Sequence, residues 1–478
     1  MCSTPLSTRT PREPQKDVLY QVLQTNLNDF LATVDGDRLP AHVVDELRAY
    51  LTCGDFAAGA ACFACASCNA RTFVPFSCKR RGFCHSCCGR RMADGAARLV
   101  DQVLPTIPYR QWVLTVPIPV RYLVLARRAL VPKILAIFLR VVFGHLRRKA
   151  AEAGITATQV GAISVEQRFG EGARCHWHIH ALLPDGVFGV AADSLPFHRV
   201  AAPTREELAA LVVTLRKRLM RLLGRHGLDP EQVDEQVAQG DLLAGWQAAA
   251  LTGRITVGPR AGWQVTRIGG QPVAMAPRGK GLCADADGVN LHAGVHVPAG
   301  QPQRLERLLC YLLRPPLVRE RLSLLPDGRV MLRLKRPYAD GTEALLLSPH
   351  DLIARLCALI PPPRVHLIHY SGVFAPHAAL RRQVVPQMDT LADEDQRLAD
   401  QSLAPAELAR TKASRHRRLS WAELMKRTWG LDVLACSCGG RLRLLGFVMD
   451  PIELASIQRS LERPASSSSS QLPLALGP

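Results

Sequence analysis

The stretch CHWHIHALLPDGVF spans residues 175–188, and in its first part, residues 175–181, histidines alternate strictly with hydrophobic residues. Successive side chains of a β-strand point to opposite faces, so this alternation places His176, His178 and His180 on one face of a strand. The run GAISVEQRFG over residues 161–170 is also typical of a strand, and the residues EGAR separate the two runs. The pattern therefore predicts a β-hairpin that carries three imidazole rings on one face.

The spacing of apolar residues elsewhere predicts helices separated by strand-like runs. Helices are expected over residues 17–52, 129–151, 204–250 and 304–314, the last ended by two prolines. Strands are expected over residues 110–120 and within 252–303, and a hairpin with a PDG turn over 321–335. We therefore predict an α+β fold, with an antiparallel sheet flanked by helices, an N-terminal helical module and a helical C-terminal region.

The composition favours a folded protein with a polyanionic partner. The chain has 478 residues, 47% of them hydrophobic, and a formal net charge of +19. This hydrophobic content excludes a largely disordered chain. The positive charge is spread over many segments rather than held in one tail, so DNA or RNA is the expected partner.

The N-terminal residues and the most apolar run bear on where the protein is found. The first residues, MCSTPLSTRTPREPQK, lack the apolar core of a signal peptide. The apolar run over residues 129–151 is interrupted at helical spacing by Lys133, Arg140 and His145, so a core helix is expected there rather than a membrane span. We expect a cytoplasmic, nucleoid-associated bacterial protein with no membrane partner.

Eight of the 15 cysteines fall between Cys53 and Cys88. In a chain without a secretion signal, such clustering favours metal thiolates over disulfides. Two C-x-x-C pairs separated by 15 residues predict a four-thiolate zinc ribbon with the ligands Cys65, Cys68, Cys84 and Cys87. Participation of Cys62, Cys78 or Cys88 stays open. A site closed by four thiolates has no open coordination position, so this zinc is expected to be structural.

Basic residues lie among these cysteines. Lys79, Arg80 and Arg81 precede the second pair, and Arg90 and Arg91 follow it. A loop held by zinc can present such side chains to phosphates without reading bases, so we expect DNA contacts from Lys79, Arg80 and Arg81.

The turn EGAR also predicts how the hairpin strands face each other. Pairing at a constant residue sum places Phe169 opposite His176 and Gln167 opposite His178, so Gln167 joins the histidine face. Two imidazoles and one amide oxygen suit Mg²⁺ or Mn²⁺ holding a phosphate oxygen. Glu166 points to the other face in this register, and a slip of one residue would exchange it with Gln167.

A nucleophile is the missing part of such a site. Among the seven tyrosines, only Tyr311 lies on a short amphipathic helix followed by an arginine, Arg314, in CYLLRPP.

These motifs together resemble the rolling-circle transposases of the insertion sequence 91 family, which are histidine-hydrophobe-histidine endonucleases. The resemblance covers residues 53 to about 460 and rests on FSCKRRGFCHSC, QWVLTVPIPVRYLVLA, EQRFG, HWHIHALLPDGVF, LHAGVHV, RLERLLCYLLRPPLVRERL, PPPRVHLIHYSGVFAPHAALR and CSCGGRLRLL. It implies that His178 and His180 bind a catalytic divalent metal and that Tyr311 attacks single-stranded DNA. The expected product is a 5′-phosphotyrosine that is passed on to a target strand. Arg314, three residues after the nucleophile in the matching motif, is expected to contact DNA.

The sequence departs from the family pattern in three places. His176 stands where relatives usually carry asparagine, and whether it contacts DNA or joins the metal site stays open. Pro315 stands where some relatives carry a second tyrosine, which favours a single-tyrosine enzyme. Cys436 and Cys438 are one residue closer than the C-x-x-C of relatives, so they are expected to form a strained pair, and a second zinc site there is doubtful.

Two other functions fit parts of the pattern. A plasmid relaxase or replication initiator would use the same chemistry, and a zinc-dependent DNA-binding protein could have lost it. The expected organisation is a flexible N-terminus (1–16), a helical and zinc-binding module that binds DNA (17–105), a catalytic domain (106–380), a helical C-terminal region with a degenerate cysteine pair (381–460) and a disordered tail (461–478). The oligomeric state is not predicted.

Overall fold

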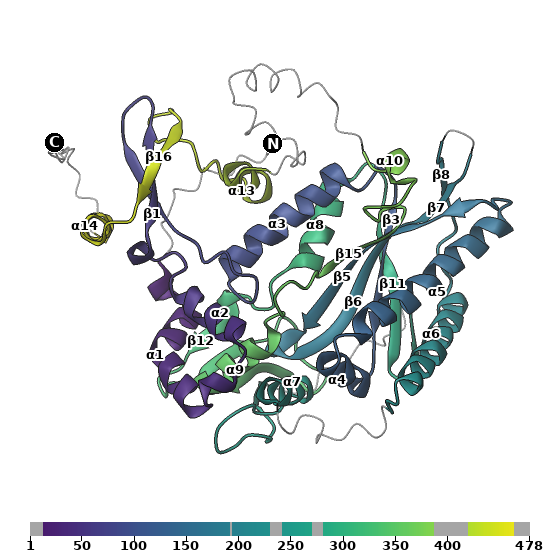
Figure 1. Ribbon diagram of the computed structural model, residues 1–478, viewed down its shortest axis with the longest axis horizontal. Helices are drawn as coiled ribbons and strands as arrows, with labels where there is room; N and C mark the ends of the chain where they lie inside the picture. Colours follow the sequence, from purple (N-terminus) through teal and green to yellow (C-terminus); the bar gives the residue numbers. More distant parts are fainter. Residues whose placement is uncertain (1–12, 192–193, 230–240, 270–280, 387–418, 463–478) are drawn as a thin grey trace.

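The computed structural model describes residues 13–191, 194–229, 241–269, 281–386 and 419–462 (Figure 1). At its centre is a six-stranded sheet in which every neighbouring pair is antiparallel, with the order β10-β11-β3-β6-β5-β15. Its strands are β3 (Tyr109–Thr115), β5 (Gly161–Phe169), β6 (Cys175–Pro184), β10 (Cys283–Ala286), β11 (Val289–Val297) and β15 (Ile368–Gly372). The predicted α+β fold with an antiparallel sheet is confirmed. The expected terminal tails lie largely outside the described residues.

Helices cover both faces of this sheet (Figure 1). On one face lie α4 (Ile118–Ala126), α5 (Leu130–Glu152) and α6 (Arg205–Arg225), and their apolar side chains share a core with Trp112, Trp177 and Ile179. On the other face lie α3 (His85–Gln102) and α8 (Pro302–Leu313), which pack on Ile163 and Leu182. Since side chains alternate along each strand, the tryptophan-bearing face of β6 is buried under α5, and the histidine face is turned toward α8.

The N-terminal helices do not have a core of their own. Helices α1 (Val18–Thr33) and α2 (Ala41–Leu51) share one apolar cluster with α7 (Leu242–Thr252), α9 (Pro349–Leu359) and a four-stranded sheet of order β12-β13-β14-β9. The strands of that sheet are β9 (Thr266–Gly269), β12 (Leu322–Leu324), β13 (Val330–Arg333) and β14 (Thr342–Leu347). The helices of the expected N-terminal module therefore pack against α7, α9 and the four-stranded sheet, which all come after β5 and β6 in the sequence.

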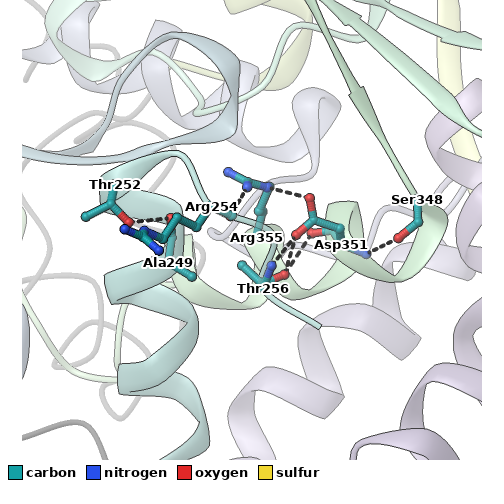
Figure 2. A network of polar contacts seen from close by, with 7 residues as sticks. All are labelled: Ala249, Thr252, Arg254, Thr256, Ser348, Asp351 and Arg355. Carbon is teal, nitrogen blue, oxygen red and sulfur yellow. Dashed lines mark hydrogen bonds and ion pairs between the residues drawn. The ribbon is translucent and has the colours of Figure 1, made fainter. Parts of the chain in front are cut away.

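A buried polar network holds the chain after α7 against α9 (Figure 2). Asp351 accepts hydrogen bonds from the backbone and the hydroxyl of Thr256, and it pairs with Arg355 one helical turn later at 3.0 Å. Arg355 also donates to the backbone carbonyl of Arg254, and the side chain of Ser348 caps α9. The irregular segment after Thr252 is thus fixed by side-chain contacts as well as by apolar packing.

A third sheet joins an N-terminal segment to the C-terminal region. Strand β1 (Ala60–Cys65) lies between β2 (Arg71–Pro75) and β16 (Leu442–Val448), and all pairs are antiparallel (Figure 1). The C-terminal region, expected to be helical, therefore contains a strand between α13 (Trp421–Trp429) and α14 (Pro451–Glu462). The remaining elements are short: β4 (Thr158–Gln159), β7 (Gly186–Gly189), β8 (Phe197–Arg199), α10 (Arg381–Val384), and single-turn helices at Pro14–Lys16, Gly36–Arg38, Phe56–Ala58, Glu171–Ala173 and Arg319–Arg321.

Within the described ranges, no helix combines the length and the apolar character needed to cross a bilayer. The long helix α5 instead buries its apolar side chains, among them Ile134, Phe138 and Val142, against the central sheet.

Candidate active site and cysteine clusters

The β5–β6 hairpin positions the histidines as expected near its middle. Gln167 pairs with His178 and Val165 with His180, so Gln167 and both histidines share one face. Nearer the turn the prediction is wrong, because a bulge after Gln167 pairs Phe169 with Cys175 and not with His176. The turn at Glu171–Ala173 is kinked, with Gly172 (φ 72°) and Ala173 (φ 52°) in the left-handed region, and the bulge shifts the register beside it by one residue.

The three side chains on this face are buried. His178, His180 and Gln167 retain 9%, 4% and 2% of their exposed surface. Burial lowers the pKa of His178 to about 4 and that of His180 to about 2, because charged imidazolium is costly away from water. Both rings are therefore neutral at neutral pH, which is the state that can bind a metal.

Neighbouring groups fix the orientation of each ring. The side-chain amide nitrogen of Gln111 lies 2.6 Å from Nδ1 of His180, and Nδ1 of His178 lies 2.8 Å from the backbone oxygen of His176. Each ring can bind a metal through Nε2 in the tautomer whose proton is on Nδ1; for His180, the Gln111 side chain then presents its amide oxygen to that N–H. Within the described chain, Nε2 of His180 and Oε1 of Gln167 are buried and have no hydrogen-bond partner. Two imidazoles whose Nδ1 atoms are held by neighbouring groups, together with one unpaired amide oxygen, form a ligand set that fits a divalent ion.

Helix α8 carries Tyr311 to the same face. The side-chain amide of Gln167 donates to the backbone oxygen of Leu312 at 2.6 Å and to that of Tyr311 at 3.3 Å. The ring centroids of Tyr311 and His180 lie 5.9 Å apart. Tyr311 is nevertheless 42% exposed, so its side chain is open to solvent. The structure thus brings together residues from two segments that the sequence connects only through the family pattern.

Cationic side chains surround these rings. The guanidinium carbon of Arg314 lies 4.6 Å from the centroid of the Tyr311 ring. Burial, and then Arg121, lower the pKa of His176 to about 3, with Arg174 a smaller contributor. Nδ1 of His176 lies 3.1 Å from Nδ1 of His178, so the third histidine contacts the pair. A site with this charge favours the binding of phosphate.

Glu166 points to the opposite face of the sheet. Its carboxylate accepts a hydrogen bond from Trp177 at 2.9 Å and pairs with Arg128, whose second nitrogen lies 2.9 Å from Oε2. The predicted preference for Gln167 over Glu166 on the histidine face therefore agrees with the strand register.

The predicted zinc ligands do not form one group. Instead, Cys84 and Cys87 lie with Cys53 and Cys78, and all four sulfur atoms are within 4.8 Å of one another. Cys53 follows α2 directly, and Cys84 and Cys87 lie at the start of α3. The expected set of two C-x-x-C pairs is thus wrong as a single group, because the fold brings Cys53 and Cys78 to the second pair. Neither Cys62 nor Cys88 belongs to a cluster among the described residues.

The first pair, Cys65 and Cys68, lies with Cys436 and Cys438 in a second group of the same dimensions. The two C-terminal cysteines, at which a second zinc site is doubtful from their spacing alone, therefore lie within reach of two further sulfur atoms. Local spacing could not reveal the pairing, because Cys65 and Cys438 are 373 positions apart in the sequence.

The expected DNA-binding residues near the cysteines differ in exposure. Lys79 is exposed and Arg80 is half-buried. Arg81 donates to the backbone oxygens of Pro362 and Val365, so its guanidinium is engaged within the protein. Its structural contacts weaken the expectation that Arg81 binds phosphate.

Sequence reasoning missed three residues that act on or lie near the histidines. Gln111 contacts His180, Arg121 lies close enough to lower the pKa of the histidines, and His292 is two strands away in the same row as His180, through Val113. The alternation of QWVLT and LHAGVHV carried a signal for Gln111 and His292, but their faces depended on pairings between distant strands.

Comparisons with known proteins match two parts of the chain. The Y2_Tnp transposase family model matches residues 161–382, which contain the histidine hairpin and Tyr311. The transposase zinc-binding domain model of the insertion sequence 91 type matches residues 22–116, which contain the first cysteine cluster. No curated protein and no solved structure matches. The chain belongs to the transposases of the insertion sequence 91 type, with an N-terminal zinc-binding domain.

Proposed function

We propose that this transposase nicks single-stranded DNA at the ends of an insertion sequence and transfers the strand, with Tyr311 as nucleophile. The observation that carries the proposal is the position of Tyr311 beside His180, on the face where Nε2 of His180 and Oε1 of Gln167 have no hydrogen-bond partner among the residues that the structure describes. A phosphodiester that reached this face would lie between a candidate metal site and an accessible phenol.

The candidate ligands are His178, His180 and Gln167, and a bound Mg²⁺ or Mn²⁺ would polarise the scissile phosphate. The chain itself supplies orientation. Gln111 and the backbone of His176 hold the two rings, and Gln167 ties the sheet to the backbone beside Tyr311. Arg314 and Arg121 add positive charge where phosphate oxygens would bind.

In the reaction, the Tyr311 oxygen forms a bond to phosphorus as the bond to the 3′ oxygen breaks. The phenol loses its proton to solvent, and the departing strand ends in a 3′ hydroxyl. The other strand end stays attached as a 5′-phosphotyrosine. Attack by a target 3′ hydroxyl then reverses these bond changes, so one phosphodiester replaces another and no ATP is needed.

The cluster of Cys53, Cys78, Cys84 and Cys87 would bind a structural zinc ion. Three of its sulfur pairs, Cys78–Cys87, Cys53–Cys84 and Cys53–Cys87, are 3.4, 3.5 and 3.8 Å apart. A tetrahedral four-thiolate site has sulfur atoms about 3.8 Å apart, given Zn–S bonds of about 2.3 Å. Zinc here would hold the start of α3, which packs against α8 and thereby supports Tyr311.

Nicking of labelled single-stranded oligonucleotides carrying an element end tests this function. Cleavage with Mg²⁺ or Mn²⁺, and none after chelation with EDTA, is expected. Binding without cleavage under all metal conditions would favour a zinc-dependent DNA-binding protein without this chemistry.

A further inference from the structure

We infer that a second structural zinc ion joins the C-terminal segment to the N-terminal domain, held by Cys65, Cys68, Cys436 and Cys438. The closest sulfur pairs are Cys65–Cys438 at 3.5 Å and Cys68–Cys436 at 3.7 Å, and all four sulfur atoms lie within 4.8 Å of one another. This spacing fits the sulfur separation of about 3.8 Å in a four-thiolate zinc site. The inference does not depend on the nuclease chemistry proposed above.

The two cysteine pairs lie in turns with the same amide arrangement. The backbone N–H of Ser67 donates to Sγ of Cys65, and that of Gly440 donates to Sγ of Cys438, both at 3.4 Å. In each case the donor is two residues after the sulfur. Such bonds stabilise the negative charge of a metal-bound thiolate. Two distant segments of the chain thus present matching halves of one site.

The close spacing of Cys436 and Cys438 is accommodated by two glycines. Cys436 donates its backbone N–H to the oxygen of Gly440 at 2.9 Å, and Gly439 closes the turn with φ 84°. A Cβ atom on Gly440 would lie 2.7 Å from Sγ of Cys65, so a larger residue there would collide with the opposite turn. The sequence CSCGG therefore provides both the ligands and the close approach.

A zinc ion at this site would stabilise the packing of β16 against β1, because the apolar core beneath these strands is small. β16 pairs with β1 from Cys65–Leu442 to Ala60–Val448. The apolar cluster beneath is small, consisting of Phe56, Ala60, Cys62, Val448, Leu454 and Ile457. The outer side of β16 exposes Leu445 and Phe447 to 61% and 67%. A small core contributes little stability, and a metal that closes a very long loop contributes most.

Metal analysis of the full-length protein tests this site. We expect two zinc ions per wild-type chain, and one after Cys436→Ala combined with Cys438→Ala. Cys68→Ala should lose the same single ion, because both halves serve one site. Cys62→Ala is the matched control, since Cys62 lies on β1 outside both clusters, and it should keep two. In the variants that lose one ion, the remaining zinc shows that the cluster of Cys53, Cys78, Cys84 and Cys87 is still folded.

Amide hydrogen exchange gives a second measurement that does not depend on activity. In the double variant, exchange over residues 442–448 should become at least about tenfold faster, while residues 161–169 of the central sheet stay unchanged. One zinc ion in the wild type, wild-type zinc content in the double variant, or different zinc content in the Cys68 and Cys436/Cys438 variants would overturn the inference.

Discussion

The side-chain amide of Gln167 donates to the backbone oxygen of Leu312 at 2.6 Å. This hydrogen bond links a candidate metal ligand on β5 to the residue after Tyr311 on α8. The amide oxygen of Gln167, Oε1, is buried without a hydrogen-bond partner in the described structure. One side chain thus both offers a ligand oxygen and sets the distance between the candidate metal site and the candidate nucleophile.

Removal of either histidine ring should abolish nicking. We expect His178→Ala and His180→Ala to lose metal-dependent cleavage by at least about 100-fold, because two remaining ligands hold a divalent ion too weakly. His176→Ala should be milder, since His176 contacts His178 but lies beyond the bulge. Cleavage of a labelled oligonucleotide across a Mg²⁺ or Mn²⁺ titration measures this.

Single-stranded DNA binding is the control for these three variants. It should persist and weaken equally with rising salt, because it depends on many Lys and Arg contacts. If His176→Ala proves as inactive as the other two, the third histidine is itself a ligand and the assignment of Gln167 fails.

Gln111 should act by positioning His180. Gln111→Ala is expected to weaken divalent-metal binding about 10- to 100-fold, which is typical for the loss of a group that orients a ligand. Cleavage should recover at high metal concentration, unlike in His180→Ala. Gln111→Glu provides a carboxylate oxygen that accepts the Nδ1–H of the metal-binding tautomer, so it should restore most of the affinity. Loss of cleavage that saturating metal does not rescue would argue against a positioning role.

How far the sequence predicts this site depends on the distance between its parts. The hairpin placed Gln167 and His178 together because the two strands are adjacent in the chain, so alternation and turn length define their register. Tyr311 required the family resemblance, since nothing local connects α8 to β5. Gln111 and His292 were missed because their faces depend on how β3 and β11 join the sheet.

The grouping of the cysteines was even harder to predict from the sequence. Equal C-x-x-C spacings suggested one ribbon, and each pair does provide two neighbouring sulfur atoms. Their partners come from elsewhere, Cys53 and Cys78 for one pair and the C-terminal Cys436 and Cys438 for the other. Spacing predicts that two cysteines form half of a site, whereas only the folded chain shows which halves meet.

The first cysteine cluster should bind its own zinc ion. Cys84→Ser and Cys78→Ser are each expected to lower zinc content by one ion per chain, to loosen residues 78–90 and to weaken DNA binding, because structural zinc contributes directly to folding. Elemental analysis with limited proteolysis checks this. Unchanged zinc in Cys78→Ser together with a loss in Cys65→Ser would restore the ribbon expected from spacing.

The ion pair on the far face of the sheet should matter for stability and not for metal binding. Arg128→Ala leaves the carboxylate of Glu166 buried without its cation, which costs about 3 kcal/mol of unfolding free energy. Arg127→Ala removes the neighbouring exposed arginine and should change stability by less than about 0.5 kcal/mol. Denaturant unfolding compares the two. Equal effects, or weaker divalent-metal binding in a folded Arg128 variant, would contradict this assignment.

Identification of the residue that becomes attached to DNA tests the central claim most directly. The protein is incubated with a single-stranded element end and Mg²⁺ or Mn²⁺, and the covalent adduct is digested and mapped by mass spectrometry. We predict a nucleotide 5′-phosphate on the peptide containing Tyr311, and no adduct from Tyr311→Phe, which should still bind the same DNA. An adduct on Tyr338 or Tyr370, or an undiminished adduct in Tyr311→Phe, would contradict the account.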